Sequence, residues 1–261
     1  MTNFTDEELR QAIETDSIRP VLQPIVDITT GKIKGVEVLA RWTGPGGAEV
    51  PPEDFIVRAI ETKLIISLTF SLMDSVRAKI SVLPPFQNML MISFNAEQEC
   101  LRSFAFVAAC KYFMATLSPL RTDLIVEVTE REPMSAESLQ KLAELHNAGA
   151  KIALDDFGSG HATMDVLDVL CPDIVKTDIS LTSLSREDDP DGLLTQCLQE
   201  LHSRTGITVV GECVETQQEA EWLAKHGVTL MQGWAFGRPL EIDALLSLMH
   251  LNMPKPSLMN K

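Results

Sequence analysis

The sequence predicts a (β/α)₈ barrel, and three features point to that fold class. Strand-like apolar runs alternate with helical patterns along most of the chain. Carboxylate, amide and lysine side chains recur where those runs end, from residue 37 to residue 232. The chain has 261 residues, 45% of them hydrophobic, which suits one large core better than several small ones. Strands that each bring their carboxyl end to one face, with helices between them, are typical of this barrel.

The expected elements follow in chain order. Strands are predicted at 19–26, 33–42, 90–95, 124–130, 151–157, 173–180, 208–215 and 229–232. Helices are predicted as a pair between residue 52 and about residue 83, and then at 98–116, 135–148, 162–170, 192–204, 217–226 and 242–249. Ser135 is a suitable helix start and Gly149 a suitable stop. We expect a single domain over residues 1–261, with the barrel core at about 19–250.

The first strand should run against the rest of the barrel. Only residues 27–32 separate the first two strands, and Thr30-Gly31-Lys32 is typical of a tight turn. A parallel connection needs a crossover of about a dozen residues or more. The first strand is therefore expected to be antiparallel.

Side-chain alternation predicts which residues face the barrel interior. In the run GVEVLAR, Glu37, Leu39 and Arg41 share one face, while Val38 and Ala40 point toward the helices. The inner face thus carries more charge than an ordinary barrel core.

Several acids are predicted to meet in one pocket at the strand ends. The candidate residues are Glu37, Asn95, Glu127, Asp155, Asp156, Lys176, Glu212 and Gln232. Burying so many carboxylates together is unfavourable unless cations neutralise them. Carboxylate and amide oxygens without histidine or cysteine favour Mg²⁺ or Mn²⁺. Five acids suffice for two metal ions, an arrangement that supports in-line displacement at phosphorus.

Composition limits the partners. A net charge of −15 opposes binding to DNA or other long nucleic acids, although a small anion beside bound cations remains compatible. No apolar run is long enough to cross a bilayer, and the N-terminal segment lacks the features of a signal peptide. Without such a run, no membrane contact by this domain is expected. Five scattered cysteines without CxxC spacing favour a reduced, cytoplasmic location. Cys213 is expected to be a small apolar filler, with a nucleophilic role as the less favoured alternative.

Seven sequence blocks in a fixed order carry a family resemblance. They are QPIVD at 23–27, EVLAR at 37–41, PPEDFI at 51–56, DDFGSG at 155–160, VKTD at 175–178, GECVET at 211–216 and QGWAFGRP at 232–239. With these blocks the chain resembles the bacterial EAL-domain cyclic-di-GMP phosphodiesterases, from about residue 19 to residue 240. The resemblance implies a hydrolase that converts cyclic-di-GMP to linear 5′-pGpG with two Mg²⁺ or Mn²⁺ ions, and it implies a homodimer.

The resemblance also implies roles for individual residues. Glu37, Asn95, Glu127 and Asp155 would bind one metal, and Asp155 with Asp156 would serve the second. Lys176 would stand near the attacking water, with Glu212 orienting the water and metals and Gln232 bonded to that assembly. Gln23 and Arg41 would contact substrate. Glu130 would anchor the loop 157–164, which couples dimerisation to activity.

Some positions depart from the family pattern. The signature block is EVL in place of EAL, but Val38 is expected to point outward and to leave the chemistry intact. Ser159 and His161 stand where the family often has Thr and Tyr, and His161 would add pH sensitivity to the loop.

Other interpretations stay open at this stage. Taken singly, DDFGSG is more often a polar turn, Lys176 a surface charge and Gln232 a strand-end cap. Trp234 and Phe236 are expected in the core, with a wall against which a guanine base stacks as the less favoured alternative. The chain could instead be a catalytically silent nucleotide sensor, or a phosphodiesterase for another small substrate. It could also be a free-standing enzyme or the cytoplasmic domain of a longer, membrane-anchored protein.

Overall fold

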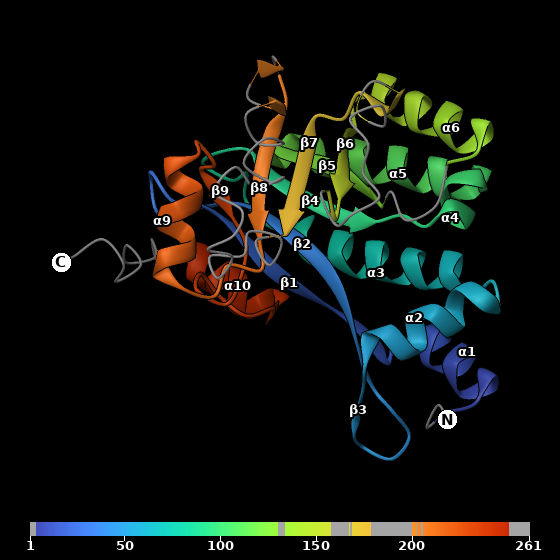
Figure 1. The fold of residues 1–261 in the computed structure, drawn as a ribbon. Helices are drawn as coiled ribbons and strands as arrows, with labels where there is room; N and C mark the ends of the chain where they lie inside the picture. The colour runs from blue at the N-terminus through green and yellow to red at the C-terminus, as the bar shows by residue number, and fades with distance from the viewer. Residues whose placement is uncertain are drawn as a thin grey trace, which may run out of the picture.

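Eight strands close into a barrel in the computed structural model, which describes residues 4–129, 134–157, 167, 169–178, 200–201, 203–204 and 206–250 (Figure 1). Neighbours in the sheet run in the order β1, β9, β8, β7, β6, β5, β4, β2, and a further β1–β2 pairing closes the ring. The barrel strands are β1 Ile18–Asp27, β2 Lys32–Thr43, β4 Leu90–Asn95, β5 Thr122–Thr129, β6 Lys151–Asp155, β7 Ile174–Asp178, β8 Thr208–Glu212 and β9 Leu230–Met231. The predicted fold class is confirmed.

The first strand runs antiparallel to both of its barrel neighbours, as predicted. β1 pairs with β2 through ten residue pairs from Ile18↔Trp42 to Asp27↔Lys32, and with β9 at Val26↔Met231. The other barrel pairings, which are β2–β4, β4–β5, β5–β6, β6–β7, β7–β8 and β8–β9, are all parallel. Gly31, at a φ of 67°, allows the tight turn between β1 and β2.

Helices cover the outside of the barrel. They are α1 Asp6–Glu14, α2 Pro52–Glu61, α3 Ile65–Ile80, α4 Gln98–Arg102, α5 Phe104–Leu117, α6 Ala136–Asn147, α9 Gln217–Lys225 and α10 Ile242–His250, with a 3₁₀ turn at Ser118–Leu120. Short strands β3 Glu49–Val50 and β10 Leu240–Glu241 pair with β2 and β1. Figure 1 shows α3, α4, α5 and α6 on one side of the barrel and α9 and α10 on the other.

Differences from the expected elements have local causes. Helix α1 was not predicted, although Thr5 and Glu8 form a capping box that signals its start. The single helix expected at 98–116 is divided at Ser103, whose φ of −82° and ψ of 120° are extended. Ser135 caps α6 by accepting a bond from the Ser138 amide, and Gly149 ends it at a φ of 104°. The helices expected at 162–170 and 192–204 lie largely outside the described residues.

The apolar core has two layers that leave one end of the barrel for polar groups. The outer layer lies between strands and helices and contains Val38 and Ala40, packed with Phe55 in the same cluster. This confirms that both residues point outward from β2. A second cluster fills the interior with Ile25, Ile125, Ala153, Ile174 and Val210. The described residues contain no helix long and apolar enough to span a membrane.

Candidate active site

Lys176 lies inside the barrel within reach of four carboxylates. Its Nζ atom is 2.9 Å from Glu127 Oε2, 2.9 Å from Glu212 Oε1, 3.3 Å from Glu37 Oε2 and 3.5 Å from Asp155 Oδ1. The Lys176 and Glu127 side chains are each 1% exposed. The site therefore holds several carboxylates around one buried cation, with the Asp155 and Glu212 side chains each 14% exposed.

Glu37 is held by two amides in addition to Lys176. The Nδ2 atom of Asn95 donates to Glu37 Oε1 at 3.0 Å, and Nε2 of Gln232 donates to Glu37 Oε2 at 2.6 Å. The Oε1 atom of Gln232 is buried and has no hydrogen-bond partner among the described residues. A buried acceptor without a partner is costly, so a bound water or a ligand that donates a hydrogen bond to Gln232 Oε1 would be stabilised here.

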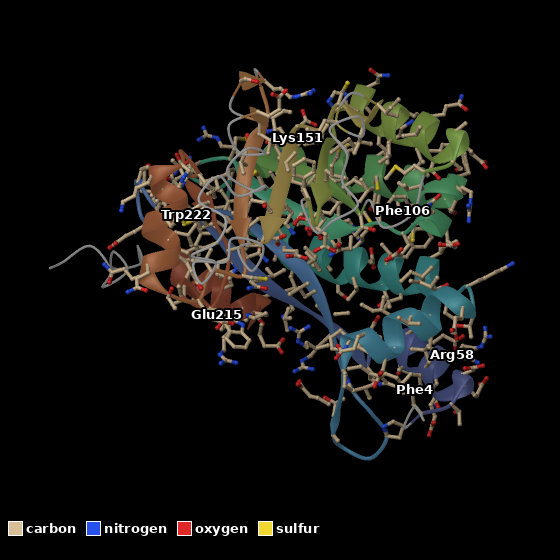
Figure 2. All side chains as sticks on the ribbon, viewed as in Figure 1. Phe4, Arg58, Phe106, Lys151, Glu215 and Trp222 are labelled. Carbon is tan, nitrogen blue, oxygen red and sulfur yellow. The ribbon has the colours of Figure 1, made fainter. Side chains whose placement is uncertain are left out.

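Strand register explains how residues so far apart in sequence meet. Gln23 pairs with Glu37 across β1 and β2, and Asn95 pairs with Glu127 across β4 and β5. Because neighbouring strands bring their carboxyl ends to one face, each supplies a side chain to the same end of the barrel. Figure 2 shows this polarity, since Lys151, at the start of β6, and Glu215, just beyond β8, lie toward opposite ends. The acids predicted from the sequence do form one cluster.

Burial and like charge change the protonation of the acids. Burial raises the pKa of Glu127 to about 8, against the opposing attraction of Lys176. Burial likewise raises the pKa of Glu212 well above its ordinary value, and a hydrogen bond to Asp155 adds to the effect. Burial opposes the charged form of Lys176, but the surrounding carboxylates outweigh it and raise the lysine pKa. For Asp155, burial is outweighed by Lys176 and by hydrogen bonds, so its pKa is lowered.

Two residues that follow the cluster acids have left-handed backbones. Asp156 has a φ of 59° and Cys213 a φ of 55°. The Asp156 amide donates to Asp155 Oδ1 at 3.0 Å, which fixes one carboxylate oxygen. Positive φ at non-glycine residues is uncommon and is often found at functional sites. Cys213 is exposed, so the expectation that it fills apolar space is wrong.

The substrate-contact candidates lie on β1 and β2, the strands next to and including that of Glu37. Gln23 is half-buried, and Arg41 donates from Nη1 to its neighbour's carbonyl oxygen, Ala40 O, at 2.8 Å. Arg41 lies on the same strand face as Glu37, four residues nearer the carboxyl end of β2. Glu130, His161 and most of the loop 157–164 lie outside the described residues.

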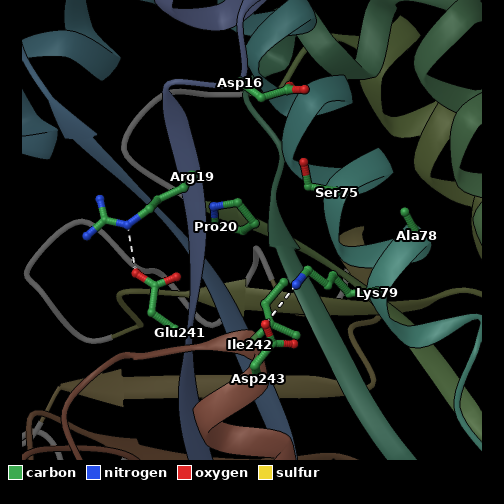
Figure 3. Close-up of a pocket in the computed structure, with 9 residues that line it drawn as sticks. All are labelled: Asp16, Arg19, Pro20, Ser75, Ala78, Lys79, Glu241, Ile242 and Asp243. Carbon is green, nitrogen blue, oxygen red and sulfur yellow. Dashed lines mark hydrogen bonds and ion pairs between the residues drawn. The ribbon is translucent and has the colours of Figure 1, made fainter.

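A separate pocket lies beside the barrel mouth without including the acid cluster. It measures about 380 Å³ and lies between β1, α3 and the β10–α10 junction (Figure 3). Arg19 pairs there with Glu241 at 2.7 Å, and Lys79 pairs with Asp243 at 2.7 Å. Each of these cations forms an exposed pair with a single carboxylate there, whereas Lys176 is 1% exposed among four, so we place the candidate active site at Lys176.

The donor set around Lys176 is chemically suited to a hard divalent cation. It consists of carboxylates with the Asn95 amide, and its acids outnumber the single buried lysine. As the described side chains stand, no three His, Cys, Asp or Glu residues are arranged to hold a metal ion. The Lys176 ammonium group lies within 3.5 Å of all four carboxylates.

Two features of the site were not predicted. Ser93 is 1% exposed and its side chain hydrogen-bonds to Glu127. Side-chain alternation in the run ISFN could have indicated this, because it puts Ser93 on the same strand face as Asn95. Trp234 is 55% exposed, so its expected core position is wrong, whereas Phe236 is buried as expected.

The barrel and its buried acid–lysine cluster at the strand carboxyl ends have the layout of a barrel enzyme. The chain belongs to the EAL domain family, whose model matches residues 6–239. It is 34% identical over 255 residues to the probable cyclic di-GMP phosphodiesterase PdeG of Escherichia coli K12, covering 96% of this chain and 50% of that protein. It is also 30% identical over 249 residues to the cyclic di-GMP phosphodiesterase PdeL of the same strain, covering 93% and 68%.

A solved structure supports the same family at the level of fold. The PaMucR phosphodiesterase in its c-di-GMP complex superposes with a TM-score of 0.79 at 26% identity, covering 92% of this chain and 98% of that one. The chain spans about half the length of PdeG.

Proposed function

We propose that this chain is a metal-dependent phosphodiesterase that hydrolyses cyclic-di-GMP to linear 5′-pGpG. The observation that carries the proposal is the buried ring of Glu37, Glu127, Asp155 and Glu212 around Lys176. Two relatives that share 30% or more of their aligned residues with the chain are named as established or probable cyclic di-GMP phosphodiesterases. We assign this activity to the EAL domain at residues 6–239.

Divalent ions fit the electrostatics of this cluster. We propose that Mg²⁺ or Mn²⁺ binds through Glu37, Asn95, Glu127 and Asp155, with Asp155, Asp156 and Glu212 serving a second ion. When bound, such ions supply Lewis acidity, a more acidic water and charge neutralisation at the phosphate. Bound cations would also favour the charged forms of Glu127 and Glu212, whose pKa values are raised mainly by burial and further by the neighbouring carboxylates.

The chain's own residues then have distinct tasks. Glu212 accepts hydrogen bonds from the attacking water and orients it toward phosphorus. Lys176 is the sole cation in the cluster as described, and it offsets the negative charge that grows on the phosphate oxygens during displacement. Gln232 and Asn95 fix the orientation of Glu37 through bonds of 2.6 and 3.0 Å. Lys176 and Gln232 are buried at 1% and 3% exposure, and burial strengthens their interactions with the carboxylates.

Arg41 and Gln23 are proposed to position the nucleotide. Arg41 forms no ion pair with the described residues, so its guanidinium group can bind a phosphate or a guanine edge. Gln23 lies opposite Glu37 across the β1–β2 pair, where it can contact the substrate beside the scissile bond.

Three further parts of the proposal rest on family likeness. The chain is proposed to act as a homodimer in the cytoplasm, with residues 1–261 as one domain. Glu130 is proposed to anchor the loop 157–164 and to couple dimerisation to activity. Analytical ultracentrifugation combined with activity measurement tests this part, and a fully active monomer would contradict it.

The deciding experiment is hydrolysis of cyclic-di-GMP by the purified chain with Mg²⁺ or Mn²⁺, followed by chromatography of the products. Parallel reactions contain EDTA, the Glu37→Ala variant, or cyclic-di-AMP and an aryl phosphodiester as substrates. Metal-dependent pGpG formation that Glu37→Ala loses is the expected result. Tight cyclic-di-GMP binding without turnover would assign the chain to nucleotide sensing, and preference for the aryl compound would reject the substrate assignment.

A further inference from the structure

An exposed tryptophan and an arginine are stacked on the loop that leaves the active site. The Cζ atom of Arg238 lies 4.2 Å from the centroid of the Trp234 ring. Trp234 is 55% exposed, and Arg238 is exposed as well. An exposed stack of this kind presents an aromatic ring and a positive charge together.

The loop that carries the pair is firmly packed. A Cβ atom on Gly233 would lie 2.1 Å from the carbonyl oxygen of Val214, and one on Gly237 would lie 3.1 Å from Pro24 Cγ. Ala235 donates its amide to Val214 O at 3.0 Å, and the Phe236 side chain is buried in the cluster that includes Val214. Trp234 is therefore exposed to solvent although the residues on both sides of it are packed against Val214.

The position of the loop places the pair at the mouth of the barrel. Gln232, two residues before Trp234, donates to Glu37 in the acid cluster. Beyond the loop, Leu240 pairs with Leu22 of β1, next to Gln23, which lies opposite Glu37. The loop thus begins at the acid cluster and ends beside the strand that carries a proposed substrate contact.

Arg238 also differs from most other arginines of the described chain. Arg19, Arg58, Arg77 and Arg102 each pair with a carboxylate, whereas Arg238 has no hydrogen bond or ion pair with any described residue. In a protein with a net charge of −15, an unpaired guanidinium group at the mouth is suited to an anionic ligand. An aromatic face beside it is suited to a base.

We propose that Trp234 and Arg238 form a nucleotide-binding platform that holds the part of cyclic-di-GMP farther from the bond that is cleaved. Trp234 stacks on a guanine base, and Arg238 orients the ring and binds the phosphate that is not cleaved. This inference rests on the proposed function, because it assigns a specificity-determining contact to that substrate. Its role is in binding, so it predicts a change in KM with little change in kcat.

Tryptophan fluorescence provides a test that does not require turnover. The chain has three tryptophans. The other two are Trp42, which is buried, and Trp222 of α9, whose ring lies against that of His226 at the end of the helix. Titration of the EDTA-treated chain with cyclic-di-GMP is expected to quench the emission. Trp234→Phe should abolish most of the quenching, and the matched control Trp222→Phe should retain it.

Steady-state kinetics with Mg²⁺ tests the assignment to binding. Trp234→Ala is expected to raise KM about tenfold, the scale of one base stack, with kcat changed less than about twofold. Trp234→Phe should recover most of the lost affinity because it restores an aromatic face. Arg238→Ala should raise KM too, and the double variant should lose less than the product of the two single effects because the residues act as a unit.

The outcomes separate this inference from the proposed function. Normal hydrolysis with unchanged KM and undiminished quenching in the Trp234 variants would overturn the platform and leave the enzyme assignment in place. Quenching that depends on Trp234 in a chain without hydrolysis would support the platform and reject the enzyme assignment. Failure of the chain to bind cyclic-di-GMP would reject both.

Discussion

Lys176 and Glu127 lie 2.9 Å apart inside the barrel, and each side chain is 1% exposed. They come from β7 and β5, which are not neighbours in the sheet, so the contact crosses the interior. Three further carboxylates approach the same lysine. A buried arrangement with this excess of acids is poorly suited to stability alone.

Removal of the central lysine is the first prediction. Lys176→Ala should lower kcat by about 10²-fold or more, because it removes a charge that stabilises the transition state, while cyclic-di-GMP binding stays within a few-fold. Lys151→Ala is the matched control, since Lys151 pairs with Asp123 at the opposite end of the barrel and should leave kcat unchanged. Chromatographic rates and nucleotide titrations measure both effects. A Lys176→Ala enzyme with near-normal kcat would contradict the assigned role.

The second prediction concerns proton release on metal binding. With a pKa of about 8, Glu127 in the metal-free protein is mostly protonated at pH 7, and Glu212 is shifted in the same direction. Metal binding needs the carboxylate forms, so it should release protons, and metal affinity should increase from pH 6 to pH 8. Calorimetric titration with Mn²⁺ in buffers of different ionisation enthalpy counts the protons. Identical heats in all buffers at pH 7 would contradict the shifted pKa values.

The same pKa shift sets the pH dependence of stability without metal. The pKa of Glu127 is raised on folding, so the folded state binds more protons than the unfolded state between about pH 4.5 and 8. The contribution of Glu127 to the free energy of unfolding is therefore expected to fall as pH rises through this window. Urea unfolding of the EDTA-treated chain checks the direction, with the Glu127→Gln variant as a reference that lacks the titrating group. An equal slope in both proteins would rule out Glu127 as the cause.

Sequence patterns predicted the site better than they predicted its surroundings. Strand alternation was enough to place Glu37 inside and Val38 outside, because a strand has only two faces. It could not show that Lys176 lies between the acids, since that depends on side chains from strands distant in sequence. The position of Trp234 was wrong for a related reason. Its apolar character favours burial, but the packing of Gly233 against Val214 holds the loop so that the ring is exposed.

Gly233 provides the fourth prediction. Its φ is 155°, and a Cβ atom at this position would lie only 2.1 Å from Val214 O, which leaves no room for a side chain. Gly233→Ala should lower the free energy of unfolding by about 2–4 kcal/mol and should also displace Gln232 and Trp234, which flank it. Gly46→Ala, where a Cβ meets nothing within 4 Å, should change stability by about 0.5 kcal/mol or less. Denaturant titration of both variants makes the comparison, and equal stability would contradict the packing of this loop.

The signature block provides the last prediction. Val38 is 4% exposed and packs in the outer core, on the strand face opposite to that of Glu37. Val38→Ala restores the family's EAL block, yet it should lower the free energy of unfolding by about 1–3 kcal/mol because it removes buried methyl groups. It should leave kcat/KM within about twofold of the parent chain, because no atom of the acid cluster moves. Val57→Ala, at a position 54% exposed, is the stability control and should have little effect. A large gain in kcat/KM from Val38→Ala would mean that the valine disturbs Glu37, in conflict with the side-chain directions found in β2.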